Sequence, residues 1–396
     1  MRAKKGSMSK QKWNSGDSGP AEVSGMRATM KLLESTGEMQ SLQPTRLNNT
    51  RKAQTEVVFF NRVPKVGSQT LMELIRRLSS KNDFGFHQDR VQRVETIRLS
   101  LEDQAELAAL VSSYEPPGVY IKHVCFTNVS NFGLPEPIYI NLVRDPVERV
   151  ISWYYYVRAP WYYVERKIAF PDIPLPDPKW LKKATVRTQP GHECGELSLS
   201  QEYFYVIDAI FSRQSAVRMQ RGHDCGEYSL FQAHFHVTGA ILASSAVMNT
   251  DFETCVLTDD RECRYVRGEI REGIGDHRRQ SMFFCGHHHD CLPFDTRGAL
   301  ERAKMAVERH YAVVGVLEEM NTTLTVLEKY VPRFFEGASD IYWNEISRYT
   351  PINKNAFKPP VSEEVKNIVR RNFTREIEFY EFCKQRLHKQ YLALKL

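Results

Sequence analysis

The stretch Asn61-Arg-Val-Pro-Lys-Val-Gly-Ser-Gln-Thr70 decides the fold of this 396-residue chain. It follows an apolar, β-rich run, Val57-Val-Phe-Phe60, and it opens an amphipathic segment with apolar residues at helical spacing: Leu71, Leu74, Ile75 and Leu78. A strand, a short Gly/Ser/Thr loop and a helix form the layout of a phosphate-binding loop, because the helix start attracts an anion. The Walker pattern is missing, since Lys65 precedes Gly67. The loop therefore predicts an anionic nucleotide, but not an ordinary ATPase.

Strands and helices alternate beyond this loop. Strands are predicted at 118–124 and 137–143, and the second is almost continuously apolar, as a buried parallel strand is. Ser100-Leu-Glu-Asp103 resembles a capping box that leads into a helix at 105–111. The remaining predicted elements are a strand at 312–316 and helices at 147–157, 300–311, 318–330 and 362–391. This alternation predicts a doubly wound α/β domain with a central parallel sheet flanked by helices.

The first 55 residues have a different composition. They are polar, contain Gly and Ser and show no periodicity, which predicts a disordered basic tail over residues 1–55. Their excess of Lys and Arg over acids equals the formal net charge of +6, so residues 56–396 are neutral overall. The charge therefore does not indicate nucleic acid, and any polyanion site must be a local patch. No apolar run in this tail is long enough for a signal peptide or a membrane anchor.

The segment at about 185–250 departs from the alternating pattern. Gly191-His-Glu-Cys-Gly-Glu-Leu-Ser-Leu and Gly222-His-Asp-Cys-Gly-Glu-Tyr-Ser-Leu repeat at a spacing of 31 residues. We interpret this tandem duplication as an inserted module, because two copies are too few for a solenoid. Its two His-x-Cys units are compatible with a zinc site, with a Cys194–Cys225 disulfide or with free thiols.

Four further cysteines form two close pairs. Cys255 and Cys263 lie eight residues apart, and Cys285 and Cys291 lie six apart with three histidines between them. Local disulfides in an oxidising compartment are one interpretation, and a zinc site built from Cys285, Cys291 and the histidines is the other. N-glycosylation sequons fit a secretory protein. They begin at Asn48, Asn128, Asn321 and Asn372.

A second anion site is predicted in Arg144-Asp-Pro-Val-Glu-Arg149-Val-Ile-Ser152. Arg144 follows a predicted strand, and ligands of open α/β sheets bind at the carboxyl ends of strands. Ser152 lies two helical turns further on and can face the same crevice. The alternative is a structural ion pair of Arg144 with Asp145 or Glu148. Together with the first loop, this segment predicts a nucleotide that carries phosphate at both ends.

These motifs resemble a known family. Asn61-Arg-Val-Pro-Lys-x-Gly-Ser68 resembles the 5′-phosphosulfate loop of Golgi sulfotransferases, and Ile138-Tyr-Ile-Asn-Leu-Val-Arg-Asp-Pro-Val-Glu-Arg149 with Ser152 resembles their 3′-phosphate site. Lys122-His-Val-Cys-Phe-Thr-Asn-Val-Ser-Asn-Phe-Gly133 and Phe283-Phe-Cys-Gly-His287 narrow the resemblance to the uronyl and heparan sulfate 2-O-sulfotransferases. The resemblance implies a P-loop-like sulfotransferase domain with a central parallel sheet.

The resemblance also implies residue roles. The donor would be 3′-phosphoadenosine 5′-phosphosulfate (PAPS), and Lys65 would stabilise the charge that builds on the leaving phosphate. His123 would act as general base toward a sugar hydroxyl, and Arg62 would face a carboxylate or sulfate of the acceptor. No metal would be needed, because transfer rests on positioning and fixed charge. The donor-binding set would be Lys65, Val66, Gly67, Ser68, Gln69, Thr70, Arg144 and Ser152.

The resemblance covers about residues 56–184 and 251–396, so it implies one domain over 56–396 that the insert interrupts. It implies Cys255–Cys263 and Cys285–Cys291 disulfides, a glycoprotein of the Golgi lumen or membrane, and a homo-oligomer, by resemblance a trimer. The expected reaction is 2-O-sulfation of uronic acid residues in heparan, dermatan or chondroitin sulfate, or in a related glycan or glycoprotein.

Several departures from the family pattern concern the acceptor. The heparan sulfate branch has a second histidine two residues before the base, where this chain has Ile121. Its basic run beyond the Arg-Asp-Pro helix is replaced by Trp161–Lys167 and a Pro-rich stretch, Phe170–Pro178. Heparan sulfate is therefore not assumed as the acceptor. The alternative function is a catalytically impaired, glycan- or nucleotide-binding relative that the insert has disabled; an ATP-dependent P-loop kinase is the third hypothesis.

Overall fold

The computed structural model of this chain describes most residues outside the insert at about 185–250. The described residues are 20–89, 96–158, 166, 169–172, 251–271, 278–347 and 358–395. The insert, with its repeated His-x-Cys units, lies outside them. The chain divides into two compact units, each considered by itself: the first from residues 1–150, 265–354 and 370–396, and the second from 151–264 and 355–369.

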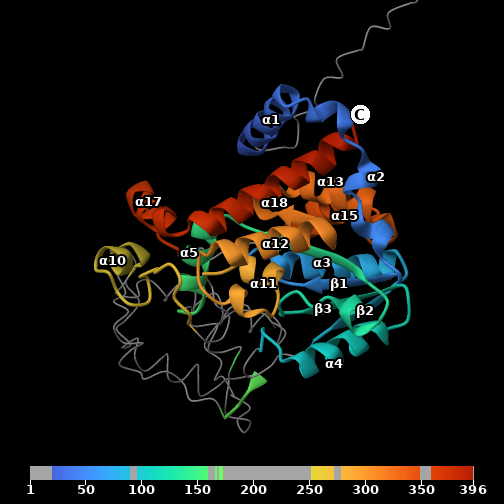
Figure 1. Ribbon diagram of the computed structural model, residues 1–396, viewed down its shortest axis with the longest axis horizontal. Coiled ribbons are helices and arrows are strands. Elements are labelled where there is room, and N and C mark those ends of the chain that lie inside the picture. Colours follow the sequence, from blue (N-terminus) through green and yellow to red (C-terminus); the bar gives the residue numbers. More distant parts are fainter. Residues whose placement is uncertain are drawn as a thin grey trace, which may run out of the picture. The chain divides into compact units, whose positions relative to one another are not determined.

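A five-stranded sheet forms the centre of the first unit (Figure 1). Its order is β2-β3-β1-β4-β5, and each neighbouring pair is parallel. The strands are β1 (Val57–Asn61), β2 (Gly85–Gln88), β3 (Gly118–Lys122), β4 (Ile138–Val143) and β5 (Tyr311–Val316). Every residue of β1, β4 and β5 is buried, which is typical of parallel strands covered on both faces. The predicted parallel α/β sheet is thereby confirmed.

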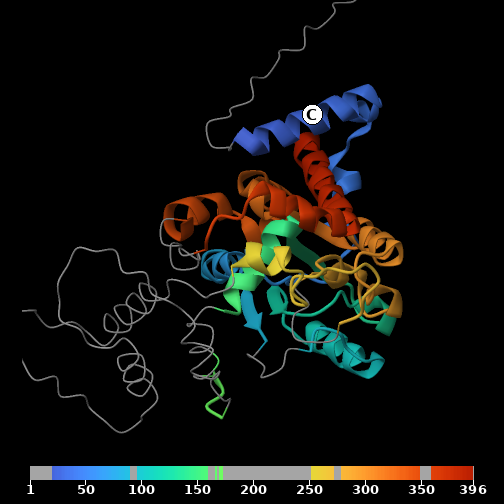
Figure 2. The same cartoon turned by 90° about the vertical axis from the view of Figure 1, so that its left-hand side faces the viewer.

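Helices cover both faces of this sheet. α18 contacts both α12 and α13 on one face, and α4 lies on the other (Figures 1 and 2). The longer helices are α3 (Ser68–Lys81), α4 (Leu101–Ser112), α12 (Arg297–Arg309), α13 (Met320–Tyr330) and α18 (Thr374–Ala393). The short elements are α2 (Pro44–Leu47), α11 (Ser281–Cys285), α14 (Pro332–Phe335), α15 (Ala338–Ile341), the π-helix η6 (Tyr342–Ile346) and the 3₁₀ helices η1 (Glu38–Ser41), η2 (Asn49–Lys52), η3 (Val129–Phe132), η4 (His289–Cys291) and η5 (Leu317–Glu319).

Most predicted elements have a counterpart at nearly the predicted bounds. The capping box is present: the Ser100 hydroxyl accepts from Asp103 N–H, and the Asp103 carboxylate accepts from Ser100 N–H. The predicted strand at 118–124 ends earlier, at Lys122. β2 was not predicted, because this short edge strand is only partly buried and has little apolar pattern. Among the described helices, none is long and apolar enough to cross a membrane.

The prediction of a disordered tail over residues 1–55 is wrong for its described part. α1 (Pro20–Ser35) is a helix whose Met26 and Leu33 are buried against Leu392 of α18. The Thr29 hydroxyl of α1 lies 2.7 Å from Nδ1 of His388, which is buried on α18. The apolar residues of α1 alternate with polar ones such as Glu22 and Thr29 that are also buried, so its buried face becomes recognisable only when α18 lies beside it, and that partner is distant in sequence.

The predicted single helix over 362–391 is also wrong. α17 (Glu363–Asn372) and α18 are separate helices with Phe373 between them. The Phe373 ring is buried edge-on against Tyr265 and Phe294, at centroid distances of 4.8 and 4.9 Å. Asp295 then caps α18, because its carboxylate accepts from the N–H groups of Arg375 and Glu376. A cap supplied by a distant loop carries no local sequence signal.

The second unit contains the end of α5 (Pro146–Tyr156), α10 (Phe252–Leu257) and the start of α17. Asp251 caps α10 by accepting from Thr254 N–H at 2.7 Å. The Tyr155 hydroxyl accepts from Phe252 N–H at 3.1 Å. The Cys255–Cys263 disulfide closes the segment that follows α10.

Gly315→Ala should destabilise the first unit, because the new methyl group would overlap Thr323 and lie 2.6 Å from Leu142 Cδ2. We expect a loss of about 1–3 kcal/mol in the free energy of unfolding, measured by urea denaturation. Gly298→Ala in α12 is the matched control, since its methyl group would meet only ordinary contacts, the nearest 3.5 Å away. Equal stabilities of the two variants would contradict this account of the β5–α13 packing.

Candidate active site

The loop after β1 has the backbone of an anion-binding site. Lys65 and Gly67 have positive φ angles of 64° and 81°. α3 begins directly afterwards at Ser68, and no side chain caps it. The first N–H groups of a helix have no partner inside the helix, so those at Ser68, Gln69 and Thr70 are directed beyond its start. An anion is a suitable acceptor for them.

Gly67 is required by space as well as by conformation. Its φ angle lies in the left-handed region that side chains disfavour. A Cβ atom built at this position would lie 2.5 Å from Cδ1 of Leu317, which follows β5. A glycine at this position of the loop thus has two independent physical reasons.

Two arginines hold the carbonyl groups of the loop. Arg149 on α5 donates through Nε to the Pro64 carbonyl at 2.9 Å, although its side chain is only 1% exposed. Arg144, directly after β4, donates through Nη1 to the Lys65 carbonyl at 3.3 Å. The guanidinium of Arg144 also lies 3.9 Å from the carboxylate of Glu148. Arg144 therefore lies near Glu148, the partner in the alternative structural ion pair, and it also contacts the loop.

His123 lies directly after β3, at the same edge of the sheet as the loop. Its Nδ1 is 2.9 Å from the Arg62 carbonyl oxygen. Because a carbonyl oxygen can only accept, Nδ1 carries the proton and Nε2 presents a lone pair. The edge is aligned by the β1–β3 register, which pairs Asn61 with Lys122, and by a 2.9 Å bond from Arg62 N–H to the Lys122 carbonyl.

The His123 imidazole is neutral at physiological pH. Burial lowers its pKa to about 3, with smaller contributions from the cationic side chains of Arg62 and Arg149. Its hydrogen bond to the Arg62 carbonyl acts in the opposite direction. A fixed tautomer and a neutral ring leave Nε2 able to accept a proton, although a pKa this low makes the ring a weak base in the free protein.

A buried polar network lies beneath the loop, and sequence analysis did not find it. Asn61 donates to the Phe283 carbonyl at 3.0 Å and accepts from the Tyr311 hydroxyl at 2.8 Å. Asn141 of β4 donates to the Asn61 carbonyl at 2.7 Å. These bonds join β1, β4, β5 and α11 at the carboxyl edge of the sheet. The available signal was an asparagine within each of two otherwise apolar strands.

Arg62 reaches across to the first turns of α3. Its Nη1 donates to Gln69 Oε1 at 3.2 Å and lies 3.3 Å from the Met72 sulfur. The structure therefore brings together Arg62, His123 and Arg144 with the loop of Lys65, Val66, Gly67, Ser68, Gln69 and Thr70. Ser152, the remaining predicted donor residue, is half-buried on the part of α5 that belongs to the second unit.

The cysteine pairs are disulfides, Cys255–Cys263 and Cys285–Cys291. The zinc interpretation of Cys285, Cys291 and the histidines is wrong, because both sulfur atoms are consumed in a disulfide. Between them, His287 accepts from Leu99 N–H through Nδ1 at 2.9 Å.

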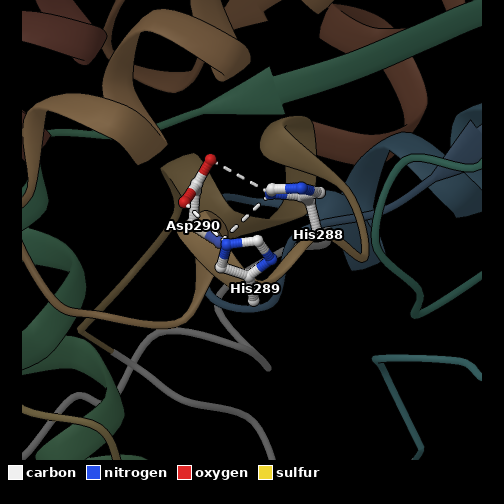
Figure 3. Close-up of side chains that lie close together, drawn as sticks. All are labelled: His288, His289 and Asp290. Carbon is white, nitrogen blue, oxygen red and sulfur yellow. Dashed lines mark hydrogen bonds and ion pairs between the residues drawn. The ribbon is translucent and has the colours of Figure 1, made fainter.

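His288, His289 and Asp290 gather at the surface with their ligand atoms within 4.8 Å of one another (Figure 3). The Asp290 carboxylate already pairs with Arg302 at 3.0 Å. A guanidinium at this distance opposes a divalent cation, so we assign these residues to a surface ion-pair cluster.

Known proteins are similar to this chain over most of its length. The model of a family described as "Sulfotransferase family" matches residues 48–383. The chain is 39% identical over 351 residues to the uronyl 2-sulfotransferase homolog pip of Drosophila melanogaster, covering 88% of this chain and 55% of that protein. It is 28% identical to human uronyl 2-sulfotransferase over 84% of this chain and 62% of the relative. For heparan sulfate 2-O-sulfotransferase 1 of Xenopus laevis the identity is 26%, over 83% and 69%. The chain thus spans 55–69% of the length of these relatives.

His123 and His287 should stay neutral far below the ordinary histidine pKa, since burial lowers their pKa values to about 3 and about 4. Carbon-13 shifts of labelled imidazoles should therefore change little between about pH 8 and 5.5, whereas both rings should titrate near 6.5 in urea. Because the unfolded chain binds more protons in this range, these groups lower the free energy of unfolding as the pH falls below about 6.5. A native midpoint near 6.5 for His123 would contradict the burial argument.

Proposed function

This chain belongs to the sulfotransferase family, and we propose that it transfers a sulfuryl group from PAPS to the 2-O position of a uronic acid residue in a glycosaminoglycan or related glycan. Relatives named as uronyl and heparan sulfate 2-O-sulfotransferases support this acceptor class. The observation that carries the proposal is the hydrogen bond between His123 Nδ1 and the Arg62 carbonyl. It joins a neutral base to the first residues of an anion-binding loop.

The loop fits the donor's 5′ end. PAPS supplies an activated sulfuryl group on a phosphate. The uncapped start of α3 would receive this phosphate through the N–H groups of the loop from Val66 to Thr70, and the hydroxyls of Ser68 and Thr70 add donors. Lys65 would place its ammonium at the bridging oxygen and stabilise the negative charge developing there. Arg144 and Ser152 would bind the 3′-phosphate.

His123 would remove the proton from the attacking sugar hydroxyl through Nε2. Its Nδ1–H bond to the Arg62 carbonyl holds the ring in one tautomer, so the lone pair stays available. The low pKa belongs to the free protein, where cationic Arg62 and Arg149 act on the ring. Anionic substrates beside these arginines would offset their charge and make His123 more basic.

Arg62 would bind the acceptor's carboxylate or sulfate. In the free protein its guanidinium donates to the neutral Gln69 side chain. A carboxylate is a stronger acceptor and allows a two-point contact with the guanidinium fork. Ile121, which stands where the heparan sulfate branch has a second histidine, is buried within β3. Because this histidine is absent, heparan sulfate is not assumed, and transfer is tested on several glycan acceptors.

We extend the proposal to the cellular setting. Two disulfides are typical of an oxidising compartment, which supports a protein of the Golgi lumen or membrane. Glycosylation is proposed at the exposed Asn372 and at the half-buried Asn128 and Asn321. A homo-oligomer, by family resemblance a trimer, is testable by light scattering on the full chain.

His123→Ala should lower sulfate transfer by about 10²–10⁴-fold, which is the usual contribution of a general base. The assay is transfer of labelled sulfate from PAPS to heparan, dermatan and chondroitin acceptors. Binding of 3′,5′-ADP should be retained, because the loop does not need the imidazole to hold an anion. The control is His289→Ala at an exposed position. Unchanged sulfate transfer in His123→Ala would contradict the assignment of His123 as general base.

A parent chain that binds 3′,5′-ADP but labels no acceptor would support the binding-only alternative. A variant without residues 185–250 then decides the cause: restored transfer would identify the insert as inhibitory.

Sulfate transfer should survive EDTA, because positioning and fixed positive charge provide the catalysis. A P-loop kinase, by contrast, requires Mg²⁺ for its nucleotide. Parallel assays with PAPS and ATP, with and without about 5 mM EDTA, separate the two hypotheses. Transfer that disappears with EDTA and returns with Mg²⁺ would contradict the proposed mechanism.

A further inference from the structure

Glu376 is a buried carboxylate that caps a helix distant from it in sequence. It lies in the first turn of α18 and is 1% exposed. Its Oε2 accepts from the N–H groups of Gln280 at 3.0 Å and Ser281 at 3.1 Å. Its Oε1 accepts from the Ser281 hydroxyl. These residues begin α11, which has no cap from its own N-cap side chain. Glu376 therefore fixes where α11 starts.

Gln280 transmits this position to Arg144. The Gln280 side chain is fully buried and pairs with both backbone groups of Arg144. Its Nε2 donates to the Arg144 carbonyl at 2.9 Å, and its Oε1 accepts from Arg144 N–H at 3.2 Å. Two simultaneous bonds fix both the place and the orientation of this backbone segment.

Arg144 connects the same network to the donor loop, since its guanidinium donates to the Lys65 carbonyl. α11 reaches the site by a second route as well. The Phe283 carbonyl accepts from Asn61 at 3.0 Å and from Phe126 N–H at 2.8 Å. A shift of α11 would thus displace both the loop and the strand ends beneath it.

The surroundings of Glu376 combine unlike charges. Arg149 faces it from α5, and the Asp295 carboxylate faces it from the loop that caps α18. Burial raises the pKa of Glu376 to about 7, while the Ser281 hydrogen bonds and Arg149 act in the opposite direction. A buried carboxyl group is costly unless donors satisfy it, and here three donors do so. All three belong to the start of α11, which ties this group to that helix.

We propose that Glu376 is a positioning residue for donor binding, acting through Gln280 to hold Arg144 beside the phosphate-binding loop. The inference rests on the proposed PAPS-dependent function. Glu376 itself contacts neither the loop nor His123 through any bond described above, so its effect is exerted through α11.

Glu376→Ala should raise the KM for PAPS and the Kd for 3′,5′-ADP by about tenfold or more, since small displacements of binding groups have effects of this size. The KM for the glycan acceptor should change by less than about threefold. Glu376→Gln should restore donor binding, because its amide oxygen can accept both N–H groups and its NH₂ can donate to the Ser281 hydroxyl. The matched control is Glu378→Ala on the same helix, whose partly exposed carboxylate pairs with Lys304 and Arg375.

Gln280→Met provides a second variant should Glu376→Ala fold poorly. It removes the pairing with Arg144 at similar volume and leaves the cap of Glu376 in place. It should raise the donor KM as Glu376→Ala does, and the double variant should show less than the sum of the two effects.

Hydrogen exchange separates failure of this inference from failure of the proposed function. If the parent chain does not bind 3′,5′-ADP, the proposed function fails, but the Arg144 amide should still exchange faster in Glu376→Ala than in Glu378→Ala. An unchanged Arg144 exchange rate in both Glu376→Ala and Gln280→Met would overturn the inference. So would donor and acceptor KM values that rise equally.

Discussion

The carbonyl groups of Arg62, Pro64 and Lys65 are held by the protein, and the rest of the site depends on this constraint. His123 binds the carbonyl of Arg62, Arg149 that of Pro64 and Arg144 that of Lys65. With its carbonyl oxygens engaged by donors, the loop can enter α3 through left-handed residues and direct N–H groups outward. The same backbone bonds that shape an anion site thus also place a base beside it.

In this arrangement some cationic side chains bind the backbone of the protein and not only the ligand. Arg149 is almost fully buried and serves the loop backbone, while Glu376 faces it from α18. Buried charges cost free energy unless they are paired and hydrogen-bonded. The bond of Arg149 to the Pro64 carbonyl and the bonds of Glu376 to the start of α11 offset part of this cost. This network of bonds also holds a geometry that isolated loops would not keep.

The predictable part of the site is local in sequence. The loop from Asn61 to Thr70 and Arg144 each follow a strand with a clear apolar pattern, so the pattern alone predicts their place at one sheet edge. His123 lies within the predicted strand at 118–124, and only the family resemblance singles it out. The partners of Asn61, Gln280 and Glu376 could not be predicted, because they lie some 80 to 220 residues away and no short pattern marks such pairs. α1 and the helix break at Phe373 were not predicted for the same reason: each depends on a partner distant in the chain. Local signals thus identify the loop and Arg144 of the candidate site, while the groups that support them arise only from tertiary packing.

Burial is the main cause of the depressed pKa of His123, and the cationic side chains that make the site attractive to anions lower it further. Arg62 and Arg149 disfavour the imidazolium, so the free protein holds a neutral but weak base. Under the proposed function, the donor and a uronate acceptor both bring negative charge to these arginines. Each bound anion offsets part of the positive potential at the ring and raises its affinity for a proton. Under the proposed function the base would therefore gain strength as the substrates bind, because the arginines that attract these anions also lower the pKa of the ring.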